Sequence, residues 1–98
     1  HAALNRVARG TQLVSVWKDA RQLGAAAGNI AAALASGVAM SDIDGAVKWS
    51  GGANGVEMDA IFLAPTPISA DNINVVIEAG HIAKDKVCEG AMAGVNGC

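Results

Sequence analysis

The apolar stretch "TQLVSVW", residues 11–17, constrains the fold of this chain more than any other part of its sequence. It is rich in β-branched residues and apolar on both faces, which is the pattern of a parallel strand covered on each side by helices. The strand ends in a charged residue, Lys18, and the chain then enters an alanine-rich segment, residues 20–36. In that segment one helical stripe collects four apolar residues, Leu23, Ala27, Ile30 and Leu34.

The rest of the chain continues the alternation of helix and strand. Residues 1–10 have the pattern of a helix, and "AVKW" and "VEMDAIFLAP" have the pattern of strand pieces separated by a turn at Asn54 and Gly55. Ser69 is a candidate N-cap for a helix over residues 70–79, whose inward-facing residues would be Ile73, Val76 and Ile77. This order of elements predicts an α/β fold with parallel sheets flanked by helices.

Composition excludes several classes of protein. The 98 residues carry seven basic and nine acidic side chains, a formal net charge of -2, and the basic residues are scattered, which argues against binding to nucleic acid or to an anionic membrane surface. No apolar run reaches the roughly 20 residues that cross a bilayer. Half of the chain is apolar but mostly small, so its core would be thin, and we expect it to be a piece of a larger protein.

Two cysteines, Cys88 and Cys98, lie in the glycine-rich segment "CEGAMAGVNGC". An even number of cysteines in such a segment predicts a disulfide and therefore an oxidising compartment, and the alternative is two unreactive thiols. His81 stands seven residues before Cys88, which is not the spacing of a metal site, so we expect no metal here.

Motifs of catalysis and cofactor binding are missing. The segment "GGANG" lacks the lysine and hydroxyl residue of a phosphate-binding loop, and no dinucleotide-binding or nucleophile-elbow pattern occurs. Asp42 and Asp44 stand before a glycine, as turn residues do, and no third ligand follows at calcium-loop spacing. Trp17 and Trp49 could stack on a sugar or pack in the protein, and for Trp49 we favour packing or simple exposure. We therefore expect neither an enzyme nor a cofactor.

Lys18 is the candidate binding residue that remains. In parallel α/β sheets, ligands bind outside the carboxyl ends of the strands, where the residue after "QLVSVW" would lie. A lysine offers three hydrogen-bond donors on a long stem and suits a hydroxyl or ring oxygen of a neutral polar ligand. The pattern alone is equally compatible with a lysine that marks a solvated strand end.

Two longer stretches carry a family resemblance. "ALNRVARGTQLVSVWKD" with the alanine-rich helix after it, and "NGVEMDAIFLAPTPISADNINVVIEAGHI", resemble the C-terminal part of the D-xylose-binding proteins of bacterial ABC transporters. The similarity extends over essentially the whole chain. These proteins belong to the type I periplasmic sugar-binding proteins.

The resemblance implies two α/β lobes joined by three crossing segments, with a monosaccharide held between them. Lys18 would contact the sugar, xylose or else glucose or a related aldose. Residues 1–19 would belong to the C-terminal lobe, residues 20–45 would form a crossing and a helix packed on the N-terminal lobe, and residues 46–98 would supply the returning strands, the last helix and the disulfide tail.

The same resemblance implies a periplasmic protein whose partners are a membrane permease and the N-terminal remainder of the same protein, as a companion chain. An alternative with the same fold is the effector-binding domain of a sugar-responsive transcription repressor. That protein would be cytosolic and would have little use for paired cysteines.

Overall fold

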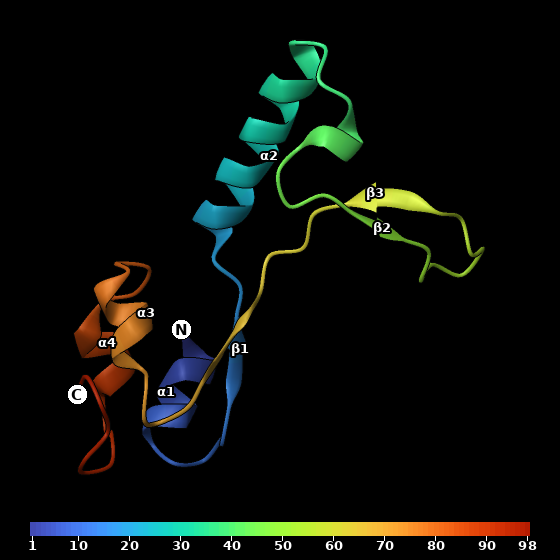
Figure 1. The fold of residues 1–98 in the computed structure, drawn as a ribbon. Helices are drawn as coiled ribbons and strands as arrows, with labels where there is room; N and C mark the ends of the chain where they lie inside the picture. The colour runs from blue at the N-terminus through green and yellow to red at the C-terminus, as the bar shows by residue number, and fades with distance from the viewer. The chain divides into compact units, whose positions relative to one another are not determined.

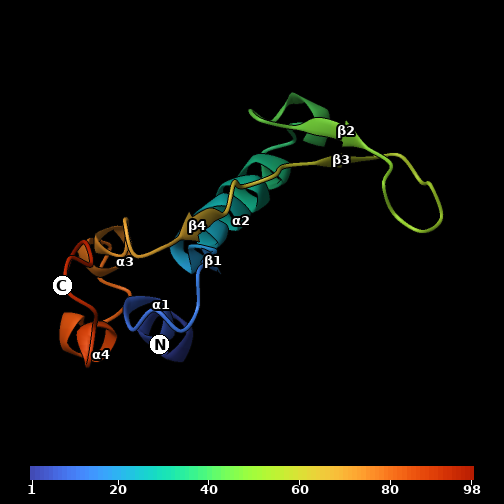
Figure 2. The same ribbon diagram turned by 90° about the horizontal axis from the view of Figure 1, so that it is seen from below.

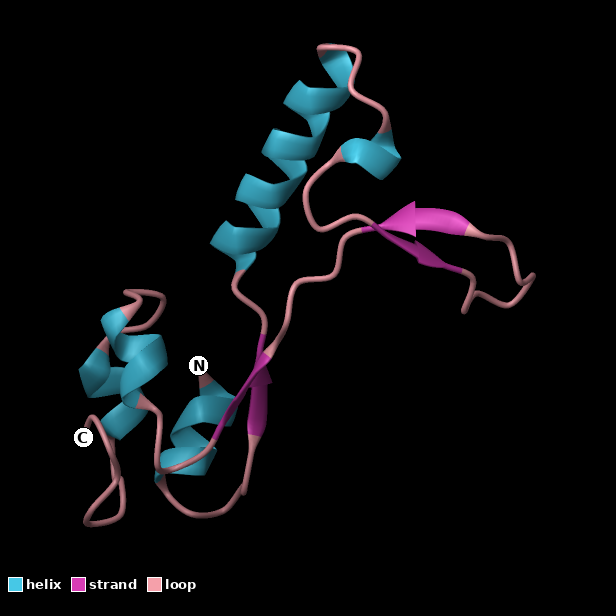
Figure 3. Ribbon diagram, viewed as in Figure 1, coloured by secondary structure: helices cyan, strands magenta, loops and turns pink.

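The computed structural model describes residues 1–98, and its regular elements are short except for one helix (Figures 1 and 3). In chain order they are α1 (Ala2–Ala8), β1 (Ser15–Trp17), α2 (Ala20–Ala35), the 3-10 helix η1 (Met40–Asp42), β2 (Val47–Trp49), β3 (Met58–Ala60), β4 (Thr66–Ile68), α3 (Asn74–Glu78) and α4 (Lys84–Cys88). None of these helices is both long enough and apolar enough to span a membrane.

The predicted α/β fold with parallel sheets is wrong. The strands form two separate antiparallel pairs, β1 with β4 and β2 with β3, and no parallel pair exists. The hairpin turn between β2 and β3 forces those strands to run in opposite directions. The apolar pattern of β1 is also not that of a strand covered on both faces, because Val14 and Val16 are 46% and 57% exposed.

The chain divides into two compact units. Unit 1 consists of residues 1–18 and 65–98, and unit 2 of residues 19–64. The chain therefore leaves unit 1 after Lys18 and returns to it at Pro65. The lobe assignments expected for residues 1–19, 20–45 and 46–98 stay predictions.

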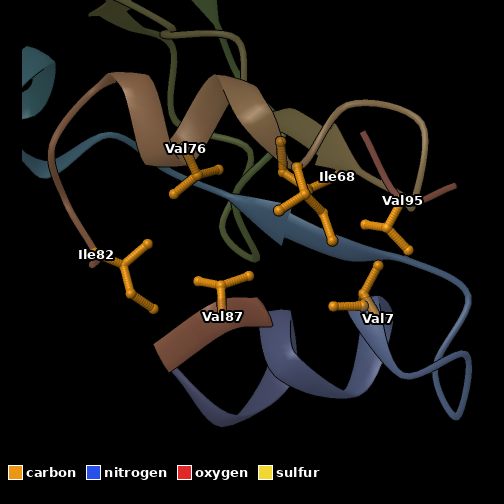
Figure 4. Packing of buried hydrophobic residues seen from close by; sticks show 8 residues of the cluster. Val7, Ile68, Val76, Ile82, Val87 and Val95 are labelled. Carbon is orange, nitrogen blue, oxygen red and sulfur yellow. The ribbon is translucent and has the colours of Figure 1, made fainter. Parts of the chain in front are cut away.

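Unit 1 contains the hydrophobic core. Apolar side chains from its helices, from β4 and from the C-terminal segment point toward one another in Figure 4. Helices α1 and α4 lie side by side below these side chains, as Figure 2 also shows. The buried residues are Val7, Ala8, Ile68, Ile73, Val76, Ile82, Val87 and Val95. Two of the three residues expected to face inward from the helix after Ser69 are thus buried, and the third, Ile77, packs against this core.

The predicted helix over residues 70–79 is shorter than expected and corresponds to α3, Asn74–Glu78. The backbone of residues 70–73 forms turns instead, because its polar groups are engaged elsewhere. The Asn72 side chain accepts a hydrogen bond from Ser69 N at 2.8 Å, and Ala70 O accepts one from Asn96 N at 2.9 Å. The C-terminal segment therefore takes the place of the first helical turn.

Unit 2 has no buried residue. Its helix α2 begins at Asp19, whose side chain accepts a hydrogen bond from Arg21 N at 2.9 Å, as N-cap residues do. Its hairpin closes at the expected turn, where Gly55 N donates to Gly52 O at 3.0 Å and Gly55 has a φ of 62°. The unit leaves much apolar surface exposed, including Leu23, Leu34 and Phe62.

Candidate functional site

Lys18 follows the last residue of β1 and is the last residue of unit 1. Trp17, before it, is half-buried against the core of unit 1, and since side chains alternate along an extended chain, Lys18 projects away from that core and is exposed. Asp19, after it, caps α2. Lys18 is therefore the residue between a half-buried tryptophan of unit 1 and the residue that caps α2 in unit 2.

The Lys18 ammonium group has no hydrogen bond or salt bridge in the structure. A different lysine, Lys48, forms a salt bridge, with its Nζ 2.6 Å from Oδ1 of Asp59 across the β2–β3 pair. Hydrogen bonding to Asp59 and its negative charge raise the pKa of Lys48 above its ordinary value of 10.5. Lys48 is thus engaged in the hairpin, while the three donors of Lys18 stay available to a ligand.

Trp17 has a ring partner that the sequence did not reveal. His81 lies against it with ring centroids 5.2 Å apart and an interplanar angle of 74°, an edge-to-face contact. His81 itself is half-buried in unit 1. No sequence pattern links two residues 64 positions apart, and only the folded chain brings them together.

Cys88 and Cys98 form the expected disulfide, with the Cα atoms 5.5 Å apart. The bond closes a segment that is also held by hydrogen bonds, since Met92 N donates to Ala8 O at 2.9 Å and Asn74 N donates to Asn96 O at 3.1 Å. This segment supplies Val95 to the core. The disulfide is therefore a structural part of unit 1.

The remaining candidate residues do not assemble into a site. Asp44 precedes Gly45, whose φ is 83°, and lies in a turn as expected, whereas Asp42 is the last residue of the 3-10 helix η1. Trp49 contacts Phe62 edge to face at 6.2 Å between ring centroids and is 38% exposed. No group of three or more His, Cys, Asp or Glu side chains could hold a metal ion.

One surface hollow of unit 1 and one of unit 2 are well defined, and Lys18 lines neither of them. The hollow of unit 1 measures about 440 Å³ and is lined by His1, Ala2, Asn5, Lys86 and Glu89. The hollow of unit 2 measures about 330 Å³ and is lined by Ala26, Asn29, Ile30, Ile43, Asp44, Ile61 and Leu63. Lys18 is exposed and lies outside these two hollows.

Comparison with protein families, with curated proteins and with solved structures gives no match for this chain. The resemblance of the sequence to sugar-binding proteins consequently stays a prediction.

Proposed function

We propose that this chain belongs to the periplasmic substrate-binding component of a bacterial sugar ABC transporter. Its ligand would be a monosaccharide, xylose in the first place and glucose or a related aldose in the second, which it would deliver to a membrane permease. The observation that carries the proposal is the exposed, unpartnered ammonium group of Lys18, which directly follows half-buried Trp17 in the chain.

The chemistry of Lys18 suits a neutral sugar. A sugar hydroxyl or ring oxygen can accept a hydrogen bond from the ammonium group, and a bond of this kind to a charged donor contributes about 1.5–3 kcal/mol. No internal carboxylate competes for the ammonium group, because Lys18 forms no salt bridge. Lys18 also stands where the chain passes from unit 1 to unit 2, as the family resemblance implies for a sugar-contacting lysine.

The disulfide supports the proposed compartment. Disulfides persist in the bacterial periplasm and are rare in the cytosol, where thiols are kept reduced. Cys88–Cys98 therefore favours a periplasmic binding protein over the cytosolic effector domain of a repressor.

The exposed apolar side chains of unit 2 support a companion polypeptide. Leu23 and Leu34 of α2 are 50% and 47% exposed, and Phe62 is 63% exposed. Exposed apolar surface that extends over several elements is typical of an interaction site. We propose that unit 2 packs on a further polypeptide surface in the functional protein.

Substitution of Lys18 by methionine tests the sugar site. Lys18→Met keeps the apolar stem and removes the donors, so we expect it to weaken binding of xylose and glucose by roughly one to two orders of magnitude. Calorimetric titration of each sugar into the complete protein, as wild type and as the variant, measures the effect.

Lys84→Met is the matched control, because Lys84 is an exposed lysine at the start of α4. It should bind both sugars as the wild type does. If Lys18→Met binds both sugars as tightly as the wild type and is equally stable, Lys18 is only a solvated strand end and the proposed site is wrong.

A further inference from the structure

The C-terminal segment is inserted into the backbone hydrogen bonds that would begin a longer helix α3. In a continuous helix, Ala70 O would accept a hydrogen bond from Asn74 N. In the structure Asn96 stands between these two groups, because Asn96 N donates to Ala70 O at 2.9 Å and Asn74 N donates to Asn96 O at 3.1 Å. The Asn96 side chain also takes the next helical acceptor, since its Nδ2 donates to Asp71 O at 2.8 Å. Asn96 thus replaces the first hydrogen bonds of the longer helix.

The residues that would begin this longer helix are already in position at Ser69. Ser69 Oγ accepts a hydrogen bond from Asp71 N at 3.3 Å, and Ser69 N donates to Asn72 Oδ1 at 2.8 Å, which is the reciprocal pattern of a helix capping box. Ile68 and Ile73 are both buried in the core of unit 1, as the two residues of a hydrophobic staple at this cap would be. The longer helix therefore has its cap and its staple and lacks only its own first hydrogen bonds.

The C-terminal segment fits closely against the start of α3. A Cβ added to Gly97 would lie 2.8 Å from Asn74 Cα, and Gly97 has a φ of 99°. Glycine is the residue that allows both this backbone conformation and so close an approach. Val95, two positions earlier, points into the same core cluster as Ile68 (Figure 4). The segment is therefore held by contacts on both sides of Asn96.

The disulfide keeps this segment in place. Cys98 follows Gly97 directly, and its bond to Cys88 closes a loop that contains Val95 and Asn96. In the chain-entropy view, closing a loop of this size favours the inserted segment by up to about a hundredfold. Cys98 is exposed, so a reductant can reach the bond.

We propose that the disulfide sets the length of α3 and makes the start of this helix a redox-sensitive switch. A dithiol reductant gives up two electrons and two protons and becomes a disulfide, while the S–S bond breaks and leaves Cys88 and Cys98 as thiols. Asn96 then withdraws, and Asn74 N donates directly to Ala70 O. Helix α3 gains its first turn, and the carbonyl groups that Asn96 has left keep hydrogen-bond donors.

The two forms of the switch are the short α3 with the segment inserted and the long α3 with the segment released. The long α3 is also the form of the chain before the disulfide first forms. The switch is separate from sugar binding, because it uses residues 69–79 and 88–98 and not Lys18.

Reduction of the disulfide tests the switch. NMR amide exchange is measured on the complete protein before and after treatment with excess dithiothreitol. The Asn96 amide should exchange at least about tenfold faster after reduction, because it loses Ala70 O as its acceptor. The Asn74 amide should keep its protection within about threefold, because it exchanges one acceptor for another. The Cα chemical shifts of residues 70–73 should move toward helical values.

Glycine substitutions test the same rearrangement without a reductant. Gly97→Ala places a methyl group against Asn74 and should release the segment with the disulfide intact, so that α3 lengthens. Gly94→Ala is the matched control, because Gly94 also has a positive φ, 84°, but no atom lies within 4 Å of its added Cβ. The control should keep the short α3.

Four results would overturn the proposal. If the Asn96 amide keeps its protection after reduction, the segment stays inserted without the disulfide. If Asn74 and Asn96 lose protection together, the segment leaves but no longer helix forms. If reduction abolishes the ring contact of Trp17 with His81, unit 1 unfolds instead of switching. The fourth result is a Gly97→Ala variant that retains this ring contact and the short α3.

Discussion

Asn5 connects the first helix of unit 1 to the end of the last. Its side-chain Nδ2 donates to the carbonyl oxygens of Val87 and Glu89, each at 2.9 Å, where α4 ends. These carbonyls have no partner within so short a helix, and the asparagine supplies one. No sequence pattern indicated this role, because the partners lie 82 and 84 residues away along the chain.

Substitution of Asn5 by alanine should destabilise unit 1. The variant leaves the half-buried carbonyl of Val87 and the carbonyl of Glu89 without their donor, so we expect the free energy of unfolding to fall by about 1–3 kcal/mol. Chemical denaturation followed by the fluorescence of Trp17, in a Trp49→Phe background, measures this loss.

The matched control is Asn74→Ala. Asn74 also donates from Nδ2, but to Glu78 Oε1 at 3.3 Å on the exposed surface of α3. The control should change the free energy of unfolding by less than about 0.5 kcal/mol. If both substitutions lower the free energy of unfolding equally, the hydrogen bonds from Asn5 to the end of α4 make no specific contribution to stability.

At the scale of elements, the sequence predicted the features that depend on neighbouring residues. It did not predict which strands pair with one another. The helix over residues 20–36 and the turn at Asn54 and Gly55 depend on neighbouring residues, and both are present. The partner of β1 could not be predicted, because the apolar pattern of residues 11–17 describes a strand without specifying its neighbour. That neighbour, β4, lies about 50 residues further on and runs antiparallel.

The candidate site was predictable only in part, for the same reason. Lys18 is found from the sequence because a charge directly after an apolar strand is a local feature. The contact of Trp17 with His81 depends on the folded chain, because the two residues lie 64 positions apart. Sequence reasoning therefore identified a residue but not its surroundings.

The turn of the β2–β3 hairpin should depend on Gly55. Its φ of 62° lies in the left-handed region, so an alanine there meets backbone strain even though no atom lies within 4 Å of the added Cβ. We expect Gly55→Ala to destabilise the hairpin by about 1 kcal/mol. Cross-strand NMR contacts between Trp49 and Met58 would report the loss.

Gly52→Ala is the control for this turn. Gly52 has no positive φ, and an added Cβ would meet the Trp49 ring at 3.8 Å, an ordinary contact distance. The cross-strand contacts should persist in this variant. If both variants lose the cross-strand contacts to the same degree, the left-handed conformation at Gly55 is not the reason for the loss of hairpin stability.

At the scale of the whole molecule, stability is distributed unevenly between the two units. All eight buried residues and the disulfide belong to unit 1, and unit 2 has no buried residue. Cooperative unfolding depends on a shared core, and the units have none in common. Each unit contains one tryptophan, Trp17 in unit 1 and Trp49 in unit 2, which makes the two separately observable.

We therefore expect the two units to unfold separately, and reduction of the disulfide to affect only unit 1. Cys88 and Cys98 are ten positions apart, and closing a loop of that size stabilises the folded state by up to about 3 kcal/mol in the chain-entropy view. Thermal unfolding of the single-tryptophan variants Trp49→Phe and Trp17→Phe, with and without a dithiol reductant, measures each unit in turn. The transition reported by Trp17 should be the sharper one and should move to lower temperature on reduction, whereas the signal of Trp49 should not change. A single transition at one temperature for both tryptophans in a monodisperse monomer would contradict this separation, and it would also remove the reason for proposing a companion polypeptide for unit 2.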